Sequence, residues 1–406
     1  MAFVAPHLER APMPGHLPSA TRSLSSAPRP RGRRAVRAAA AAAVLTGLLA
    51  GTGGTPVASA VGDAAQVRGA GTARVQHVSH EAVAARGADW MARQIRANGG
   101  YLSGFGVPDV NDTAYAVIGL NAAGGHRRAS TEALGYLRRH VSSLTSADGS
   151  DNPAALAYFI LAGVSAGADV AHFGGSKPAN DLPARLLRTV RLTGSDSGLV
   201  GTADPTYDGA FRQGLALAAL SATAPGPRAS RRVRLAVRWL ERQQCANGLW
   251  QAYRSDTSVP CAAADPATFS GPDTNSTSLA VQGLHAYGLS PRRWNVIRSL
   301  HAVQSSDGGF PYLAAPGQAS DPNSTALSIQ AVLAERGSLK AASWRKDGAT
   351  AYDALASYQL GRGRLGRRDA PADRGAFFYG DIRTPSVLAT VQAVPAAAGR
   401  TLPVRG

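Results

Sequence analysis

Residues 273–284 read Asp-Thr-Asn-Ser-Thr-Ser-Leu-Ala-Val-Gln-Gly-Leu, and this stretch decides the fold. The same frame returns at 321–332 as Asp-Pro-Asn-Ser-Thr-Ala-Leu-Ser-Ile-Gln-Ala-Val, and at 109–120 as Asp-Val-Asn-Asp-Thr-Ala-Tyr-Ala-Val-Ile-Gly-Leu. Each copy is Asp-x-Asn-(Ser/Asp)-Thr-(Ala/Ser) followed by an apolar helical pattern. A frame that occurs three times in one chain indicates first a repeated structural unit, and only second a functional site.

A second pattern alternates with this frame from residue 81 onward. A helical segment ends in an Asn-Gly or Asp-Gly turn followed by an aromatic residue, as at 94–101, 243–250 and 304–310. Gly after the last turn supplies a left-handed cap, and the aromatic residue is expected to fold back onto the helices. The polar residues of the Asp-x-Asn frame can satisfy the free amides of the next helix. Each cycle therefore predicts two helices.

The cycles predict an all-α fold, an (α/α)6 toroid of six helix-pair repeats. The second helices, such as 279–284 and 327–333, are apolar on nearly all sides and must be surrounded by protein. The first helices are amphipathic, with arginines on the predicted solvent-exposed face of 231–242. Six buried helices ringed by six half-exposed ones close on themselves and leave no open end. The predicted cycles are 81–124, 130–167, 181–223, 230–288, 292–337 and 348–394, so the toroid spans 81–394 and 395–406 form a tail.

The first sixty residues are typical of an export signal. An arginine-rich stretch precedes the apolar run 38–50, and Val-Ala-Ser-Ala at 57–60 has the small-x-small pattern of a cleavage site. The apolar run is too short to remain as a membrane anchor. We therefore predict a signal peptide at 1–60, a flexible leader at 61–80, and a secreted, extracellular protein with no permanent membrane anchor.

Charge and cysteine content limit the function classes. The formal net charge is +17, but no basic run is interleaved with aromatic residues in the body of the chain, so nucleic-acid binding is not predicted. Cys245 and Cys261 are the two cysteines, and in an exported protein such a pair indicates a disulfide. They have no Cys-x-x-Cys spacing and no histidine pattern beside them. We therefore predict no metal site and no cofactor.

The aromatic turns resemble the glutamine–tryptophan motif of squalene–hopene and oxidosqualene cyclases. With them, 81–394 is similar to the superfamily of terpenoid cyclase and protein prenyltransferase α/α toroids, whose members do unrelated jobs. Asp109-Val-Asn111-Asp112-Thr-Ala is close to the cyclase motif Asp-x-Asp-Asp-Thr-Ala, in which the central Asp protonates an alkene or epoxide. Asn111 stands in that position, which puts cyclase activity in doubt. The asparagine is instead predicted to be a helix cap with an acidic neighbour.

The sequence favours a non-catalytic protein that binds an unknown small molecule or a cell-envelope partner. The Asp-x-Asn frames should lie at one end of the closed ring, where helix N-termini favour anionic or strongly accepting groups. The alternative is a terpene cyclase-like enzyme that acts on an isoprenoid or other apolar substrate through Asp109 and Asp112, and a third possibility is a cell-envelope scaffold. The predicted ligand-binding residues are Asp109, Asn111, Asp112, Asp273, Asn275, Asp321 and Asn323.

Overall fold

The computed structural model describes residues 79–406 except 105, 148, 202–204, 227–228 and 362–368. The predicted signal peptide and almost all of the predicted leader lie outside the described residues. By internal contacts the chain divides into two compact units, Met1–Ala64 and Ala65–Gly406, and everything below concerns the second. No helix in the described ranges is both long and apolar enough to span a bilayer.

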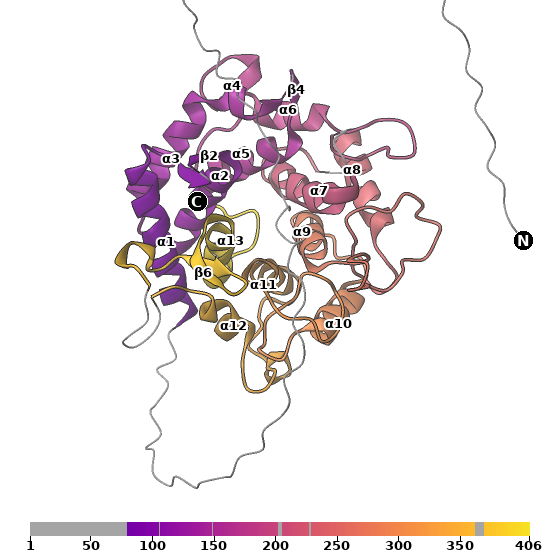
Figure 1. Cartoon of the computed structure of the whole chain (residues 1–406). Helices are drawn as coiled ribbons and strands as arrows, with labels where there is room; N and C mark the ends of the chain where they lie inside the picture. Colours follow the sequence, from indigo (N-terminus) through magenta and orange to yellow (C-terminus); the bar gives the residue numbers. More distant parts are fainter. Residues whose placement is uncertain (1–78, 105, 148, 202–204, 227–228, 362–368) are drawn as a thin grey trace, which may run out of the picture. The chain divides into compact units, whose positions relative to one another are not determined.

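Helices that close into a ring form the centre of this unit. Each inner helix packs against the next one along the chain, and the last packs against the first (Figure 1). The inner helices are α2 (Val110–Ala123), α5 (Pro153–Ser165), α7 (Pro205–Ser221), α9 (Thr274–His285), α11 (Pro322–Arg336) and α13 (Val387–Ala397). This closure is the arrangement that the sequence pattern predicts.

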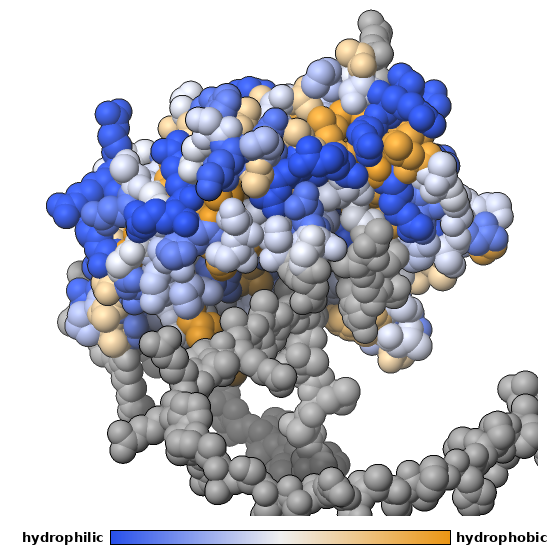
Figure 2. All heavy atoms as spheres, turned by 90° about the horizontal axis from the view of Figure 1, so that it is seen from above, coloured by the Kyte–Doolittle hydropathy of each residue, from blue (hydrophilic) through white to orange (hydrophobic). Residues whose placement is uncertain are grey.

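A second set of helices lies outside the ring, and each of its main members packs against an inner helix (Figure 1). They are α1 (His80–Ala97), α3 (Arg127–Arg139), α6 (Leu182–Arg188), α8 (Arg231–Gln243), α10 (Arg293–Val303) and α12 (Ala351–Ser357), with the single turn α4 (Val141–Leu144) after α3. Burial follows the predicted division. Residues 276–284 of α9 are all buried, whereas α8 buries Val233 and Trp239 and exposes Arg238. Figure 2 shows one side of the unit, where hydrophilic residues dominate and apolar ones form small patches.

Small antiparallel hairpins interrupt three of the loops that lead to inner helices. They are β1 (Leu102–Gly104) with β2 (Val107–Asp109), β3 (Ser146–Ala147) with β4 (Ser150–Asp151), and β5 (Phe377–Tyr379) with β6 (Ile382–Ser386). An all-α prediction did not include them. Strands of two to five residues are too short to show a pattern of alternating hydrophobicity, so the sequence carried no signal for them.

Two residues of the Asp-x-Asn-(Ser/Asp)-Thr frame perform the same structural task in each copy. The Asp273 carboxylate caps α9 by accepting the Ser276 N–H at 2.6 Å. The Thr277 hydroxyl accepts the Trp250 N–H at 2.9 Å and donates to the Asp273 carbonyl, so it fastens the aromatic turn to the helix. The same N–H to threonine bond joins Leu102 to Thr113, Phe310 to Thr325 and Phe377 to Thr390. The frame therefore builds the junction between an outer and an inner helix.

Glutamine side chains tie neighbouring units together. The Gln304 amide donates to the carbonyl oxygens of Gly308 in its own turn and of Trp344 before α12. Gln244 makes the equivalent pair of bonds, to Gly248 and Pro291. Gln243, with which we aligned this motif in the sequence, instead bonds to the backbone of Arg254. The alignment was one residue out because two glutamines stand side by side.

The segment predicted as a tail packs against the ring. α13 runs to Ala397, past the predicted boundary at 394, and Pro395 lies inside it. Leu402 is 2% exposed, and its N–H donates to the Gln282 Oε1 on α9 at 2.9 Å. Val404 is also buried. These residues cover the carboxyl-terminal side of the inner helices, since Gln282 lies in the last turn of α9.

Candidate functional site

The inner helices present their frames at one end of the ring. The Ser278 and Ser328 hydroxyl oxygens of α9 and α11 lie 3.5 Å apart, and the Thr274 N–H at the start of α9 donates to the Tyr312 carbonyl in the loop before α11. The two helices therefore begin at the same end of the ring. Tyr115 and Tyr158, in the second turns of α2 and α5, also meet, with ring centroids 5.6 Å apart. We call the first turns of α2, α9 and α11 the amino end of the ring.

The frame asparagines face the axis of the ring. Thr277 points outward to the Trp250 turn, and a helix advances by about 100° per residue, so Asn275 lies about 160° away around α9. The same spacing relates Asn323 to Thr325 and Asn111 to Thr113. α9 and α11 are adjacent, which brings Asn275 and Asn323 to neighbouring positions. Asn111 comes from α2, which packs on α13, the neighbour of α11.

These asparagines are not the caps that we expected. The cap of each helix is the Asp two residues earlier, at Asp109, Asp273 and Asp321. Within the described residues, the buried Oδ1 atoms of Asn275 and Asn323 have no hydrogen-bond partner. Asn323 is only 9% exposed. A buried amide oxygen without a partner costs roughly 1–3 kcal/mol, so these side chains weaken the fold rather than hold it.

Most of the amides at the start of α9 already have partners inside the protein. The Thr274 N–H donates to the Tyr312 carbonyl at 2.8 Å, and the Asp273 N–H donates to the Trp250 carbonyl at 3.0 Å. The Asp273 carboxylate accepts the Ser276 N–H. Three of the four amides that this helix start leaves open are therefore satisfied, so the start of α9 offers an anion few free donors.

Burial shifts the pKa of each carboxyl group that is enclosed here. It raises the pKa of Asp273 to about 6 and that of Asp321 above its usual range. It raises the pKa of Asp112 well above the usual value, and the charge of Asp109 adds to the shift. Asp109, by contrast, is only half-buried, and its carboxylate caps α2 through the Asp112 N–H at 2.9 Å. In the described ranges no set of three or more His, Cys, Asp or Glu residues is arranged to hold a metal ion.

Below the first turns, axis-facing side chains are buried against each other. Tyr115 of α2 is 2% exposed and packs against Tyr158 of α5. Leu279 and Leu327, at the corresponding positions of α9 and α11, are 2% and 1% exposed. Large side chains therefore occupy the axis at this level. The polar residues of the predicted site lie in the first turns.

Three aromatic residues precede inner helices at this end. Phe269 and Tyr312 come from the loops before α9 and α11, Tyr379 comes from β5 before α13, and we call the three the aromatic strip. Phe269 stacks on Tyr312 with centroids 5.2 Å apart and planes 13° apart. The Tyr312 carbonyl accepts the Thr274 N–H at 2.8 Å, which places Tyr312 beside the start of α9. Burial raises the pKa of Tyr312, and the charges of Asp273 and Asp321 raise it further. Phe269 is 59% and Tyr379 47% exposed.

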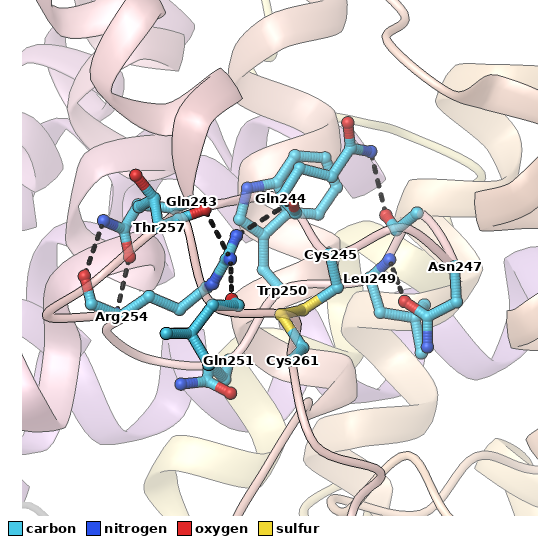
Figure 3. Close-up of a disulfide and its surroundings, with 12 residues drawn as sticks. Gln243, Gln244, Cys245, Asn247, Leu249, Trp250, Gln251, Arg254, Thr257 and Cys261 are labelled. Carbon is cyan, nitrogen blue, oxygen red and sulfur yellow. Dashed lines mark hydrogen bonds between the residues drawn. A yellow bond between two sulfur atoms is a disulfide. The ribbon is translucent and has the colours of Figure 1, made fainter.

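The predicted disulfide between Cys245 and Cys261 is present and holds the loop that carries Phe269 (Figure 3). Arg254 fixes the same loop from inside. Arg254 is 8% exposed. Its guanidinium donates to the carbonyl oxygens of Arg242, Gln244, Thr257 and Val259. Four carbonyl bonds and one disulfide therefore hold the first part of the loop, and two backbone bonds between Asp265 and Ser270 close the turn that carries Phe269.

Sequence reasoning missed the aromatic strip and Arg254. The three residues are separated by 43 and 67 residues in the chain and share no periodicity, and Tyr379 ends the aromatic run 377–379 of β5. The signal that could have found them is their shared position, because each precedes the start of an inner helix. The order of the helices around the ring then brings the loops together.

Comparisons with known proteins identify the fold. No protein-family model matches the chain, and no curated protein matches it. A variant of the type II terpene cyclase MstE from Scytonema, without ligand, aligns with a TM-score of 0.50 and 14% identity, covering 79% of this chain and 97% of that one. The unsaturated glucuronyl hydrolase of Bacillus sp. GL1, responsible for the degradation of glycosaminoglycan, aligns with a TM-score of 0.51 and 12% identity, covering 78% and 96%. At these identities the likeness shows an α/α-toroid fold and no activity.

Proposed function

We propose that this protein binds a ligand at the amino end of its ring and does not transform it. The observation that carries the proposal is the pair of unpartnered amides, Asn275 and Asn323, on adjacent helices. Each costs roughly 1–3 kcal/mol in the free protein. Groups that weaken a fold are typical of sites where function requires them. Of the other predicted residues, Asp273 and Asp321 cap the same two helices, and Asp109, Asn111 and Asp112 lie at the start of α2.

The scaffold that we infer is an (α/α)6 toroid of six helix-pair repeats with turns of the squalene–hopene cyclase type. Its support is that each inner helix follows an outer helix in the chain and that Gln244 and Gln304 make matching pairs of bonds. We also propose that residues 1–60 are a signal peptide and that the protein is secreted. The Cys245–Cys261 disulfide supports an oxidising compartment.

A second candidate function is acid catalysis on an isoprenoid by Asp112. It is favoured by burial and by the Asp109 charge, which keep the Asp112 carboxyl protonated to higher pH than usual. Two observations favour binding instead. Asn111 stands where the cyclase motif has its acid, and an apolar ligand over Asn275 and Asn323 would leave both amides unpaired at a cost of roughly 1–3 kcal/mol each.

Thermal denaturation of the full chain with three probes tests the proposal. Chitohexaose, geranylgeraniol and cobalamin represent glycans, isoprenoids and corrinoids. We expect one of them to raise the melting temperature, and the Asn275→Leu/Asn323→Leu double variant to lose the shift. Absence of a shift with all three probes refutes ligand binding at this end. Conversion of geranylgeraniol by the wild type but not by Asp112→Asn would establish the enzyme instead.

A further inference from the structure

We infer that the ligand is a neutral glycan, whose sugar rings lie on the aromatic strip while its hydroxyl groups bond to Asn275 and Asn323. This inference rests on the proposed function and names its ligand class. It combines three observations made at one place: exposed flat rings, unpartnered buried amides, and carboxylates that already cap the helices.

The strip has the form that a sugar face requires. Phe269 and Tyr312 are stacked with their planes only 13° apart, so their inner faces cover each other and the outer face of Phe269, which is 59% exposed, is open to a sugar ring. An aromatic face carries partial negative charge, and the C–H groups on one face of a sugar ring are weakly positive. Tyr379, at the end of β5 before α13, is 47% exposed and offers a second ring. One sugar ring of an oligosaccharide can therefore contact Phe269 and another can contact Tyr379.

The amides require a partner that both donates and accepts. Asn275 and Asn323 each present one carbonyl and one NH2 group, and the buried oxygen of each is unpaired in the described structure. Rotation of such an amide breaks no existing bond to that oxygen, so either end can turn toward the ligand. A hydroxyl group serves both ends, because it carries one donor and two acceptor positions. Polyhydroxylated ligands meet this need better than an isoprenoid alcohol such as geranylgeraniol, which has one hydroxyl.

Charge selects a neutral glycan over an acidic one. Asp273 and Asp321 cap α9 and α11 at this end, and three of the four amides at the start of α9 are occupied. Asp109 and Asp112 add carboxyl groups on α2. A uronic acid would meet like charge with few free donors. Arg383 of β6 is already paired with Asp369 and lies over the Phe378 ring.

Isothermal titration of the full chain tests the inference with four probes: chitohexaose and cellohexaose as neutral glycans, a hyaluronan hexasaccharide as an acidic one, and geranylgeraniol as an isoprenoid. We expect a neutral glycan to bind and the acidic one not to. Phe269→Leu keeps an apolar side chain and removes the ring, so we expect about tenfold weaker glycan binding. Trp294→Ala is the matched control, because Trp294 is 66% exposed on the outer helix α10, and its loss should leave affinity unchanged.

The outcomes separate this inference from the proposal beneath it. Binding of geranylgeraniol that is lost in Asn323→Leu, with no glycan bound, overturns the glycan and leaves binding at the amino end standing. Binding of neither class overturns both. If a glycan binds but neither Phe269→Leu nor Tyr379→Leu weakens binding, the aromatic strip is not the site and the inference is overturned. Tighter binding of hyaluronan than of the neutral glycans overturns it as well. Because both aromatic side chains are exposed, neither variant is expected to impair folding.

Discussion

Replacing Asn323 by leucine should make the protein more stable. The Asn323 side chain is 9% exposed, and its Oδ1 has no partner in the described structure, a state that costs roughly 1–3 kcal/mol. Leucine removes this cost and has the higher helix propensity, by a few tenths of a kcal/mol. Leu388 occupies the corresponding second position of α13, where it is 41% exposed, so the start of an inner helix accepts leucine at a less enclosed site. We expect a gain of about 1–2 kcal/mol in the free energy of unfolding.

Urea denaturation followed by linear extrapolation measures this change. Asp321→Ala is the matched control two residues away in the same turn. It removes the cap bond to the Ser324 N–H at 2.8 Å and should lower stability by about 1 kcal/mol. The two variants alter neighbouring polar side chains of one frame and should shift stability in opposite directions.

A loss of 1 kcal/mol or more in Asn323→Leu would refute the reasoning. Such a loss would mean that the Asn323 amide is hydrogen-bonded in the folded protein, as a cap or through another partner. The argument for a ligand at the amino end would then lose its main support. A gain in stability together with retained ligand binding would separate the two claims, because the amide would be costly without being used.

Three further predictions follow from the same contacts. Cys261→Ser should lower the free energy of unfolding by about 3 kcal/mol, the value for opening a loop of 16 residues, and a reductant should have the same effect on the wild type but none on the variant. Asp273→Asn keeps a side-chain oxygen that can cap α9. In the folded wild type the pKa of Asp273 is raised from 3.8 to about 6. Protonation of Asp273 therefore stabilises the folded state fully below about pH 4, and this stabilisation is lost as the pH rises through 6. The variant should therefore match the wild type near pH 4 and exceed it by up to about 3 kcal/mol at pH 7.5 in urea titrations. Thr277→Val leaves the buried Trp250 N–H unpaired and should cost roughly 1–3 kcal/mol in the same assay, with equal stability ruling out the fastening role.

Helix starts and helix burial were predictable because each depends on residues that are adjacent in the sequence. The Asp-x-Asn frame at 273 marks the start of α9 to within one residue, since a cap and its helix are contiguous. The uniform burial of 276–284 likewise follows from a helix that is apolar on all sides. The disulfide was predictable from the presence of only two cysteines. Each of these inferences needs no knowledge of which helix is the neighbour.

The site was only partly predictable because its chemistry depends on neighbours. Asp, Asn, Ser and Thr can all cap a helix, and sequence alone does not assign the bond among the four residues of a frame. The structure assigns the cap to Asp273 and the contact with the turn to Thr277. Asn275 is left without a role in the fold. That distinction, on which the ligand argument depends, becomes visible only when all partners are known.

The variation among the inner helices supports the same division of labour. The outward threonine position is kept as Thr in α2, α9, α11 and α13, and in α7 Gln213 replaces it by accepting the Val200 N–H at 2.8 Å. The axis-facing position two residues earlier is not kept. It holds Asn111, Asn275 and Asn323 in three helices and Leu388 in α13. A position that the fold does not constrain is free to differ around a ring. The asparagines therefore mark the side of the ring where polar groups are required by something other than the fold.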